Sequence, residues 1–234
     1  MAGSLPREVA SGVYQVGLGF VNVWLVEDAG GGLWLVDAGV EPGAERIGGA
    51  IRFLGRAPHE LRGVVVTHLH PDHVGGLAAV KEHTGAEVWM GAADAELVRA
   101  GRRGRALEPG PGLTRSLVVR LMGERTLREH APVAVEHDLH DGDELPFGAT
   151  AVHTPGHTAG HMALLLGRDG GVLVAGDAAT DFVRLGVGPI YEDVEEGMRS
   201  LRRLSGLEFE TALFAHGRAL GPRASVRFRA RWGA

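Results

Sequence analysis

Cysteine is absent from this chain of 234 residues. The absence excludes disulfide bonds, thiolate nucleophiles and zinc sites built on sulfur ligands. Any metal ion that the protein binds must therefore be held by nitrogen and oxygen atoms, which histidine and the acidic side chains supply. The sequence offers 12 histidines and 29 acidic residues for such a site.

Long apolar runs and a strong charge of one sign are also missing. No stretch reaches the roughly 18 apolar residues of a membrane span, and a net charge of −5 argues against broad nucleic-acid binding. Residues 1–13 contain neither a basic cluster nor an apolar segment, so no secretory signal is visible. We therefore expect a cytoplasmic protein that acts on a small molecule, without a membrane or nucleic-acid partner and with its oligomeric state left open.

What is present describes an ordinary globular protein. The chain is 44% hydrophobic and 23% charged, and it has no disordered or repetitive segment. This length and composition predict a single domain over residues 1–234. The 37 glycines match a fold with many turns between strands and loops.

The order of apolar patterns predicts an α/β fold. Alternating or continuous apolar stretches predict strands, and apolar residues three or four positions apart predict helices. The expected strands cover residues 12–26, 32–36, 64–67, 88–90, 149–153, 162–166, 172–175 and 211–215, and the expected helices cover 42–54, 73–83, 93–100 and 194–204. Residues 101–136 interrupt this order, and we interpret them as a cap-like insertion over the site.

One short segment concentrates side chains that bind metals. Three histidines and an aspartate follow the apolar run 63–66, in the sequence Thr67-His68-Leu69-His70-Pro71-Asp72-His73. The apolar run predicts a buried strand, so the cluster is expected on the loop at its carboxyl end. Because a proline bends the chain between the first two histidines and the last two residues, the two pairs can point at two centres. The spacing favours two metal ions.

Three further candidate ligands stand at the ends of apparent strands. They are His157, Asp177 and His216, and each is flanked by glycine or other small residues. Strand ends hold side chains rigidly, and a neighbouring glycine lets the backbone approach closely. Taken alone, such a histidine is more often a capping or packing residue, and such an aspartate a turn residue. Beside the first cluster, they complete a plausible ligand set.

These motifs resemble those of the metallo-β-lactamase superfamily of dinuclear metallohydrolases, and the resemblance runs from residue 37 to residue 216. It implies a four-layered αβ/βα sandwich with the metals at the edge between two sheets. The implied ligands are His68, His70 and His157 for one metal, Asp72, His73 and His216 for the second, and Asp177 as a bridge. Asp37 resembles an aspartate that orients a ligating imidazole, and we expect His161 beside the ligands in a supporting or packing role.

The resemblance also implies a chemistry. Two divalent ions about 3.5–4 Å apart lower the pKa of a shared water toward 7 and polarise the carbonyl group that is attacked. Zinc is the favoured ion, and iron or manganese suits the same ligands. Asp72 is the candidate catalytic residue because it can relay a proton. We therefore expect a metal-dependent hydrolase of a small carboxylic ester, thioester or lactone, whereas the substrate-binding residues stay unassigned.

Departures from the known subfamilies narrow the expectation. True β-lactamases use a cysteine ligand or lack the bridging aspartate, whereas this chain has no cysteine and keeps Asp177. Thioester hydrolases of the glyoxalase II kind share the metal motifs, but residues 217–234 leave no room for their C-terminal helical domain. Lactonases fit the length and the insertion, yet they often place a tyrosine shortly after the bridging aspartate. Tyr191 is a more distant substitute.

Other classes of protein compete with a hydrolase. The main alternative is a mononuclear-iron dioxygenase that oxidises a thiol persulfide, which metal analysis with oxygen consumption would separate. A phosphodiesterase, a β-lactamase and a non-catalytic metal-binding protein are weaker alternatives. The segment after His216 adds arginines at 218, 223, 227, 229 and 231 without an acidic residue, and we interpret it as a solvated face near the acidic residues 192–196.

Overall fold

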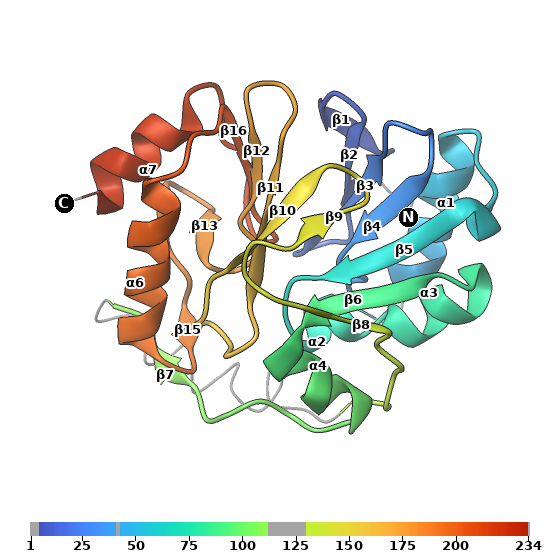
Figure 1. Cartoon of the computed structure of the whole chain (residues 1–234), viewed down its shortest axis with the longest axis horizontal. Coiled ribbons are helices and arrows are strands. Elements are labelled where there is room, and N and C mark those ends of the chain that lie inside the picture. Colours follow the sequence, from blue (N-terminus) through green and yellow to red (C-terminus); the bar gives the residue numbers. More distant parts are fainter. Residues whose placement is uncertain (1–4, 41–42, 112–129, 234) are drawn as a thin grey trace.

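The described residues form four layers in the order helices, sheet, sheet, helices (Figure 1). The computed structural model describes residues 5–40, 43–111 and 130–233. The predicted α/β class and the four-layered αβ/βα sandwich are both confirmed by this arrangement. Within the described ranges, no helix is long and apolar enough to cross a membrane.

The first sheet has seven strands. Their order is β1 (Arg7–Ala10), β2 (Val13–Gly17), β3 (Asn22–Glu27), β4 (Leu33–Val36), β5 (Leu61–Val66), β6 (Glu87–Gly91) and β8 (His137–Leu139). Strands β1 to β4 pair antiparallel, whereas β4, β5, β6 and β8 are parallel and therefore need crossover connections. Those connections contain α1 (Gly43–Phe53), η1 (Pro58–Glu60), α3 (Leu77–Thr84) and α4 (Ala92–Arg99).

The second sheet has five strands, in the order β16 (Thr211–Leu213), β12 (Val172–Val174), β11 (Met162–Leu166), β10 (Ala149–His153) and β9 (Glu144–Leu145). Helices α6 (Val194–Ser205) and α7 (Ala224–Trp232) cover its outer face (Figure 1). Helix α6 begins at Asp193, whose side chain accepts a hydrogen bond from the backbone N–H of Glu196.

Apolar side chains fill the space between the two sheets. Val64 and Val66 on β5 are completely buried, as is Val65 between them, because this strand has protein on both faces. On β12 the side chains alternate: Val172 and Val174 join the core between the sheets, and Leu173 packs with α6 and α7. The continuous apolar runs in the sequence therefore correspond to strands buried on both faces.

The expected helix over residues 73–83 is instead two helices, α2 (Pro71–Val74) and α3. Gly76 separates them, and its backbone N–H donates to the carbonyl of Gly39 at 2.9 Å. A Cβ atom on Gly76 would lie 2.3 Å from the carbonyl oxygen of Ala38. Close packing against the 38–40 loop therefore requires glycine here and interrupts the helix.

The insertion expected at 101–136 is described only in part, because residues 112–129 lie outside the described ranges. In its first part, β7 (Glu108–Pro109) pairs with β15 (Ile190–Tyr191). The backbone N–H of Arg105 also donates to Glu192 at 2.7 Å. This first part therefore lies against the 189–192 segment, while a cap formed by the insertion and the single-domain organisation stay predictions.

A short hairpin leaves the second sheet after β12. It consists of β13 (Ala179–Asp181) and β14 (Leu185–Val187), and Asp181 also forms a bridge with Gly217 just beyond β16. The hairpin thus joins the segment after Asp177 to the segment around His216. Neither this hairpin nor α7 is among the elements predicted from the sequence.

Candidate metal centre

The loop after β5 carries its histidines into the interior of the protein. His68 and His73 have no exposed surface, and His70 is 2% exposed. Pro71 occupies the first turn of α2, where its fixed backbone angle suits a helix start and its missing N–H costs nothing. The helix turns the chain at once, so side chains before and after the proline contribute to different groups of ligand-type atoms.

The first group contains His68, His70 and His157, whose ligand atoms all lie within 4.8 Å of one another. Nε2 of His68 is 3.0 Å from Nδ1 of His70 and 3.2 Å from Nε2 of His157. Nδ1 of His157 donates to the carbonyl of Ile190 at 2.9 Å, which leaves a lone pair on Nε2. This hydrogen bond aims a nitrogen lone pair at the other two rings.

The second group contains Asp72, His73 and His216, again with ligand atoms within 4.8 Å of one another. Nε2 of His216 lies 3.1 Å from a carboxylate oxygen of Asp72. Nδ1 of His216 donates to the carbonyl of Phe20 at 2.8 Å, so Nε2 is the nitrogen with the free lone pair. As the sequence pattern predicted, His68 and His70 belong to the first group, whereas Asp72 and His73 belong to the second.

Asp177 lies between the two groups. Its Oδ2 atom is 3.4 Å from Nε2 of His157, 3.3 Å from Nε2 of His216 and 3.8 Å from Nε2 of His73. One carboxylate oxygen therefore faces ring nitrogens of both groups. Gly176, just before it, has φ 52°, and a Cβ atom there would lie 2.7 Å from Nε2 of His161. Glycine lets the strand end approach the histidines this closely.

The donor atoms of these groups fit divalent cations. Nε2 of His73 and Oδ1 of Asp177 are buried and have no hydrogen-bond partner among the described residues. A buried polar atom without a partner is costly unless another species binds it. Burial, with the neighbouring imidazoles adding to its effect, holds the pKa values of His68 and His70 well below the usual range. Neutral imidazoles and carboxylates suit zinc, iron or manganese.

The second group has a different charge state in the metal-free protein. Burial opposes a charge on His73, but the carboxylates of Asp37 and Asp72 raise its pKa to about 9. Burial opposes the charge on His216 too, but Asp177 and Asp72 raise the pKa of His216 to about 11. Burial would raise the pKa of Asp72, yet His73 and His216 lower it to about 2. In the metal-free protein His73 and His216 therefore hold protons at neutral pH, and a bound cation would replace them.

Asp37 orients a histidine of the second group through a hydrogen bond. It is completely buried, and its φ of 62° is a left-handed conformation that aspartate adopts more readily than most residues. Its carboxylate accepts from Nδ1 of His73 at 2.9 Å and from the backbone N–H of Thr67 at 2.7 Å. The contact fixes the His73 ring with Nε2 toward Asp177, which is the arrangement expected of an orienting aspartate.

His161 lies beside the ligand set rather than in it. The backbone N–H of Asp177 donates to its Nε2 at 3.1 Å, and its Nδ1 bonds the hydroxyl of Thr154 at 2.7 Å. Both ring nitrogens therefore have protein partners. The His161 side chain holds the backbone next to Asp177 in place.

Sequence reasoning missed Asp94 on α4. This buried carboxylate accepts from the backbone N–H of Leu69 at 3.0 Å, from the Thr158 hydroxyl at 2.7 Å and from the backbone N–H of Gly160 at 2.7 Å. It ties the 67–73 loop to the loop that carries His157. Burial raises the pKa of Asp94 to about 7, against the opposing effect of these donors. The sequence did contain one signal for it: Asp94 lies on the apolar face of the helix with Ala95 and Val98, where an acidic residue is unusual.

Two phenylalanines beside His216 were also missed. Phe20 and Phe182 are 61% and 60% exposed, and each stacks on the ring of His216, at 5.9 Å and 6.1 Å between centroids. Exposed large apolar side chains beside a buried polar cluster are typical of a ligand-binding surface. The ring of Tyr191 lies next to the first group, 6.0 Å from that of His157.

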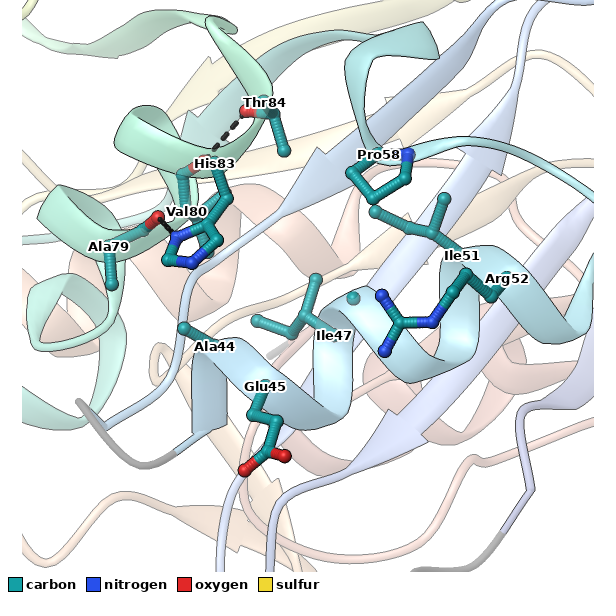
Figure 2. A pocket seen from close by; sticks show the side chains of 11 residues that line it. Ala44, Glu45, Ile47, Ile51, Arg52, Pro58, Ala79, Val80, His83 and Thr84 are labelled. Carbon is teal, nitrogen blue, oxygen red and sulfur yellow. Dashed lines mark hydrogen bonds between the residues drawn. The ribbon is translucent and has the colours of Figure 1, made fainter.

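A separate pocket lies on the outer layer, between α1 and α3 (Figure 2). Its volume is about 240 Å³, and Ile47, Ile51 and Val80 form much of its apolar wall. In Figure 2 the ring of His83 hydrogen-bonds the carbonyl of Ala79. Because none of the residues that line this pocket belongs to the two groups described above, it carries no part of their chemistry.

Comparison with known proteins identifies the family. Residues 16–216 match the family model of the metallo-beta-lactamase superfamily. The hydroxyacylglutathione hydrolase of a Marinomonas species is 27% identical over 197 residues, which cover 82% of this chain and 59% of that protein. The chain thus spans well under two thirds of the length of this relative. The probable metallo-hydrolase YflN of Bacillus subtilis is 28% identical over 232 residues, covering 90% of this chain and 85% of the relative.

Solved structures agree with this assignment. A metallo-beta-lactamase from Cronobacter sakazakii superposes with a TM-score of 0.71 at 26% identity, covering 92% of this chain and 78% of that one. BJP-1, a subclass B3 metallo-beta-lactamase of Bradyrhizobium japonicum, superposes with a TM-score of 0.73 at 22% identity, covering 99% and 91%, and shows the fold alone. The matched family range and these neighbours confirm the expected family of metal-binding hydrolases: the chain belongs to the metallo-beta-lactamase superfamily.

Proposed function

We propose that the protein is a metal-dependent hydrolase that cuts a carboxylic ester, thioester or lactone of a small molecule. One observation carries the proposal: ligand-type atoms from seven side chains, contributed by residues 68–73 and by three distant positions, meet in two groups with an oxygen of Asp177 facing both. Such a set fits two divalent ions, with zinc favoured and iron or manganese as alternatives. Their number and identity are part of the proposal, as is a cytoplasmic location.

The proposed ligands divide as the groups do. His68, His70 and His157 would hold one ion, Asp72, His73 and His216 the other, and Asp177 would contact both. When bound, a pair of ions supplies a water of lowered pKa and an electrophilic contact for a carbonyl oxygen. Nothing in this proposal requires a serine or cysteine nucleophile.

The chain's own residues supply positioning and proton transfer. The Asp72 side chain is 21% exposed and lies 3.1 Å from His216, so it connects the buried cluster with solvent. A carboxylate in this position can accept a proton from the attacking water and pass it to the leaving group. Asp37, Asp94 and His161 hold the ligand-bearing loops in place without facing the substrate.

The surroundings favour an acyl substrate. The exposed rings of Phe20 and Phe182 flank His216 and offer an apolar surface beside the proposed metal positions. The relatives named hydroxyacylglutathione hydrolase act, by that name, on a thioester-type substrate, which supports thioesters as the first class to test. Because the chain spans 59% of the first of these relatives, their particular substrate is not carried over.

The test begins with elemental analysis of protein purified without added metal. The same preparation is then assayed on thioesters, lactones and carboxylic esters, with a β-lactam and bis-p-nitrophenyl phosphate as comparison substrates and with oxygen consumption on a persulfide. We expect bound metal and turnover of a member of the first panel. Iron with oxygen uptake and no hydrolysis would instead establish a persulfide dioxygenase.

Variants connect activity to the proposed ligands. Asp177→Ala and His70→Ala should each reduce kcat by about a thousandfold or more and release metal, while the circular dichroism spectrum stays that of the folded protein. His59→Ala is the matched control, because His59 is a histidine of η1 outside both groups. Full activity and unchanged metal content in both ligand variants would refute the assignment.

A further inference from the structure

A second hollow lies on the side of α7, next to the β13–β14 hairpin. Its volume is about 470 Å³, and four arginines line it: Arg184 from the hairpin turn, Arg218 from the segment after β16, and Arg227 and Arg231 from α7. Asp181 is the one acidic residue in its lining. The remaining lining side chains include Val183, Leu185 and Leu220.

These four arginines have no carboxylate partner among the described residues: no ion pair within 4.0 Å involves any of them. Several other surface arginines do have carboxylate partners. Arg199 contacts two glutamates of its own helix, Arg203 contacts Asp141, and Arg229 contacts Glu208. Arginines without an ion pair occur elsewhere on the surface too, but at this hollow four of them line one cavity together with a single carboxylate. Like charges this close repel one another unless an anion lies between them.

Helix α7 separates its arginines into two kinds. Arg227 and Arg231 are four residues apart and therefore lie on the same face of the helix, toward the hollow. Arg229 points elsewhere and pairs with Glu208, while Phe228 and Trp232 are buried against the second sheet. The expected pairing with the acidic residues 192–196 does not occur among the described residues: Arg229 pairs with Glu208, and no ion pair involves Arg218, Arg227 or Arg231.

The hollow adjoins the proposed metal centre. Gly217 stands between His216 and Arg218 in the chain and forms a bridge with Asp181. The backbone N–H of Arg218 donates to the carbonyl of Asp181 at 3.0 Å. Phe182, which follows Asp181 in the chain, stacks on the ring of His216. Two consecutive residues at the end of β13 therefore connect the sites: Asp181 lines the arginine hollow, and Phe182 contacts His216 of the proposed metal centre.

We propose that this hollow binds the phosphate groups of an anionic small molecule and that, resting on the function proposed above, this molecule is the substrate. Four guanidinium groups against one carboxylate leave three positive charges to be balanced. A single carboxylate ligand would balance one, whereas a phosphate monoester carries about two negative charges at neutral pH. Guanidinium groups also bind phosphate oxygens in pairs, which gives geometry as well as charge. The phosphate-bearing half would be the leaving group of an ester or thioester.

The first test measures phosphate binding. Inorganic phosphate is titrated calorimetrically into the metal-loaded protein and into an Arg227→Gln, Arg231→Gln double variant. We expect the double variant to bind about tenfold more weakly. Arg229→Gln is the matched control, since it removes the same charge from the same helix outside the hollow. Phosphate held at the metal centre alone would bind equally to all three proteins, and that result would overturn the proposal.

The second test uses two thioesters with the same acyl group, one releasing a thiol that carries phosphate and one releasing an uncharged thiol. The double variant should raise KM for the phosphorylated thioester about tenfold and leave kcat/KM for the uncharged one unchanged. Weakened phosphate binding with unchanged KM for both would assign the hollow to a separate phosphorylated ligand and refute its role in substrate binding. If no protein cleaved either thioester, the proposed hydrolysis would fail, while the titration would still decide the hollow.

Discussion

At the scale of single residues, Asp94 connects two ligand-bearing loops although it touches no proposed ligand atom. Its carboxylate accepts three hydrogen bonds, two of them from backbone N–H groups in different loops. Asp94→Asn keeps the shape but turns an NH₂ group toward at least one of those donors. We expect kcat/KM and metal affinity to fall about ten- to hundredfold, as for other changes that misplace ligands.

Asp138→Asn provides the control for this change. Asp138 is an exposed aspartate that pairs with Arg99, and its loss should leave activity within about twofold because surface ion pairs contribute little. Both variants are compared by steady-state kinetics and by chelator competition for the metal. Wild-type metal affinity in Asp94→Asn would mean that the two loops hold their positions without this carboxylate.

The metal-ligand candidates could be predicted from the sequence. Of the two supporting aspartates, Asp37 could be predicted and Asp94 could not. His68, His70, Asp72 and His73 are adjacent in the chain, so their pattern is local. Asp37 follows an apolar strand and is found by the same rule. The role of Asp94 depends on loops that reach it from 25 and 66 residues away, and single-sequence periodicity contains no information on such pairs.

At the scale of elements, the break between α2 and α3 connects packing to the site. Gly76 packs against the backbone at Ala38, and the backbone N–H of Ala38 donates to the carbonyl of His73. We expect Gly76→Ala to lower the free energy of unfolding by about 1–3 kcal/mol, because the new methyl group meets a carbonyl oxygen that cannot move freely.

Gly49→Ala in α1 is the opposite case. A Cβ atom on Gly49 has no neighbour within 4 Å, so alanine there should raise the free energy of unfolding by about 0.5–1 kcal/mol through helix propensity alone. Urea denaturation of the two variants measures both values. Equal effects of the same sign would show that the backbone contact at Gly76 does not determine the outcome.

Strands within a continuous apolar run were predictable from sequence, including the short β12 and β16, whereas short strands outside such a run and charged elements were not. Strands such as β5 and β11 have five or six mostly apolar residues, enough for a clear pattern. Strands β13 to β15 have only two or three residues and depend on tertiary contacts. In α7 the buried residues Ala224, Phe228 and Trp232 have helical spacing, but the intervening arginines obscure it. The prediction of a single helix over residues 73–83 was wrong because Gly75 and Gly76 interrupt it, ending α2 and preceding α3.

At the scale of the whole molecule, the proposed metal centre joins the two sheets. His68, His70, Asp72 and His73 follow β5 of the first sheet, whereas His157, Asp177 and His216 come from the second. Removing metal should therefore destabilise the entire protein. With free metal at about a hundred times its Kd, binding adds about 2.7 kcal/mol to the free energy of unfolding.

Thermal unfolding before and after treatment with a chelator measures this effect. The melting temperature should fall when metal is removed and recover when zinc is added back. An unchanged melting temperature, in a sample that elemental analysis shows to be metal-free, would mean that apolar packing alone holds the sheets together.

The charge state of the second group also makes metal affinity depend on pH. In the metal-free protein the pKa of His73 is about 9 and that of His216 about 11, so both rings hold a proton at neutral pH. A ligating imidazole must be neutral, and each ring therefore releases a proton when metal binds.

Since protons compete with the metal for these rings, metal binding becomes stronger as the pH rises toward the two pKa values. From about pH 6 to about pH 8, affinity should rise by up to about two powers of ten per pH unit. Competition with a chromophoric chelator, corrected for the chelator's own protonation, measures the slope. A flat profile would mean that the rings are already neutral, and that Asp37, Asp72 and Asp177 do not hold protons at the second group.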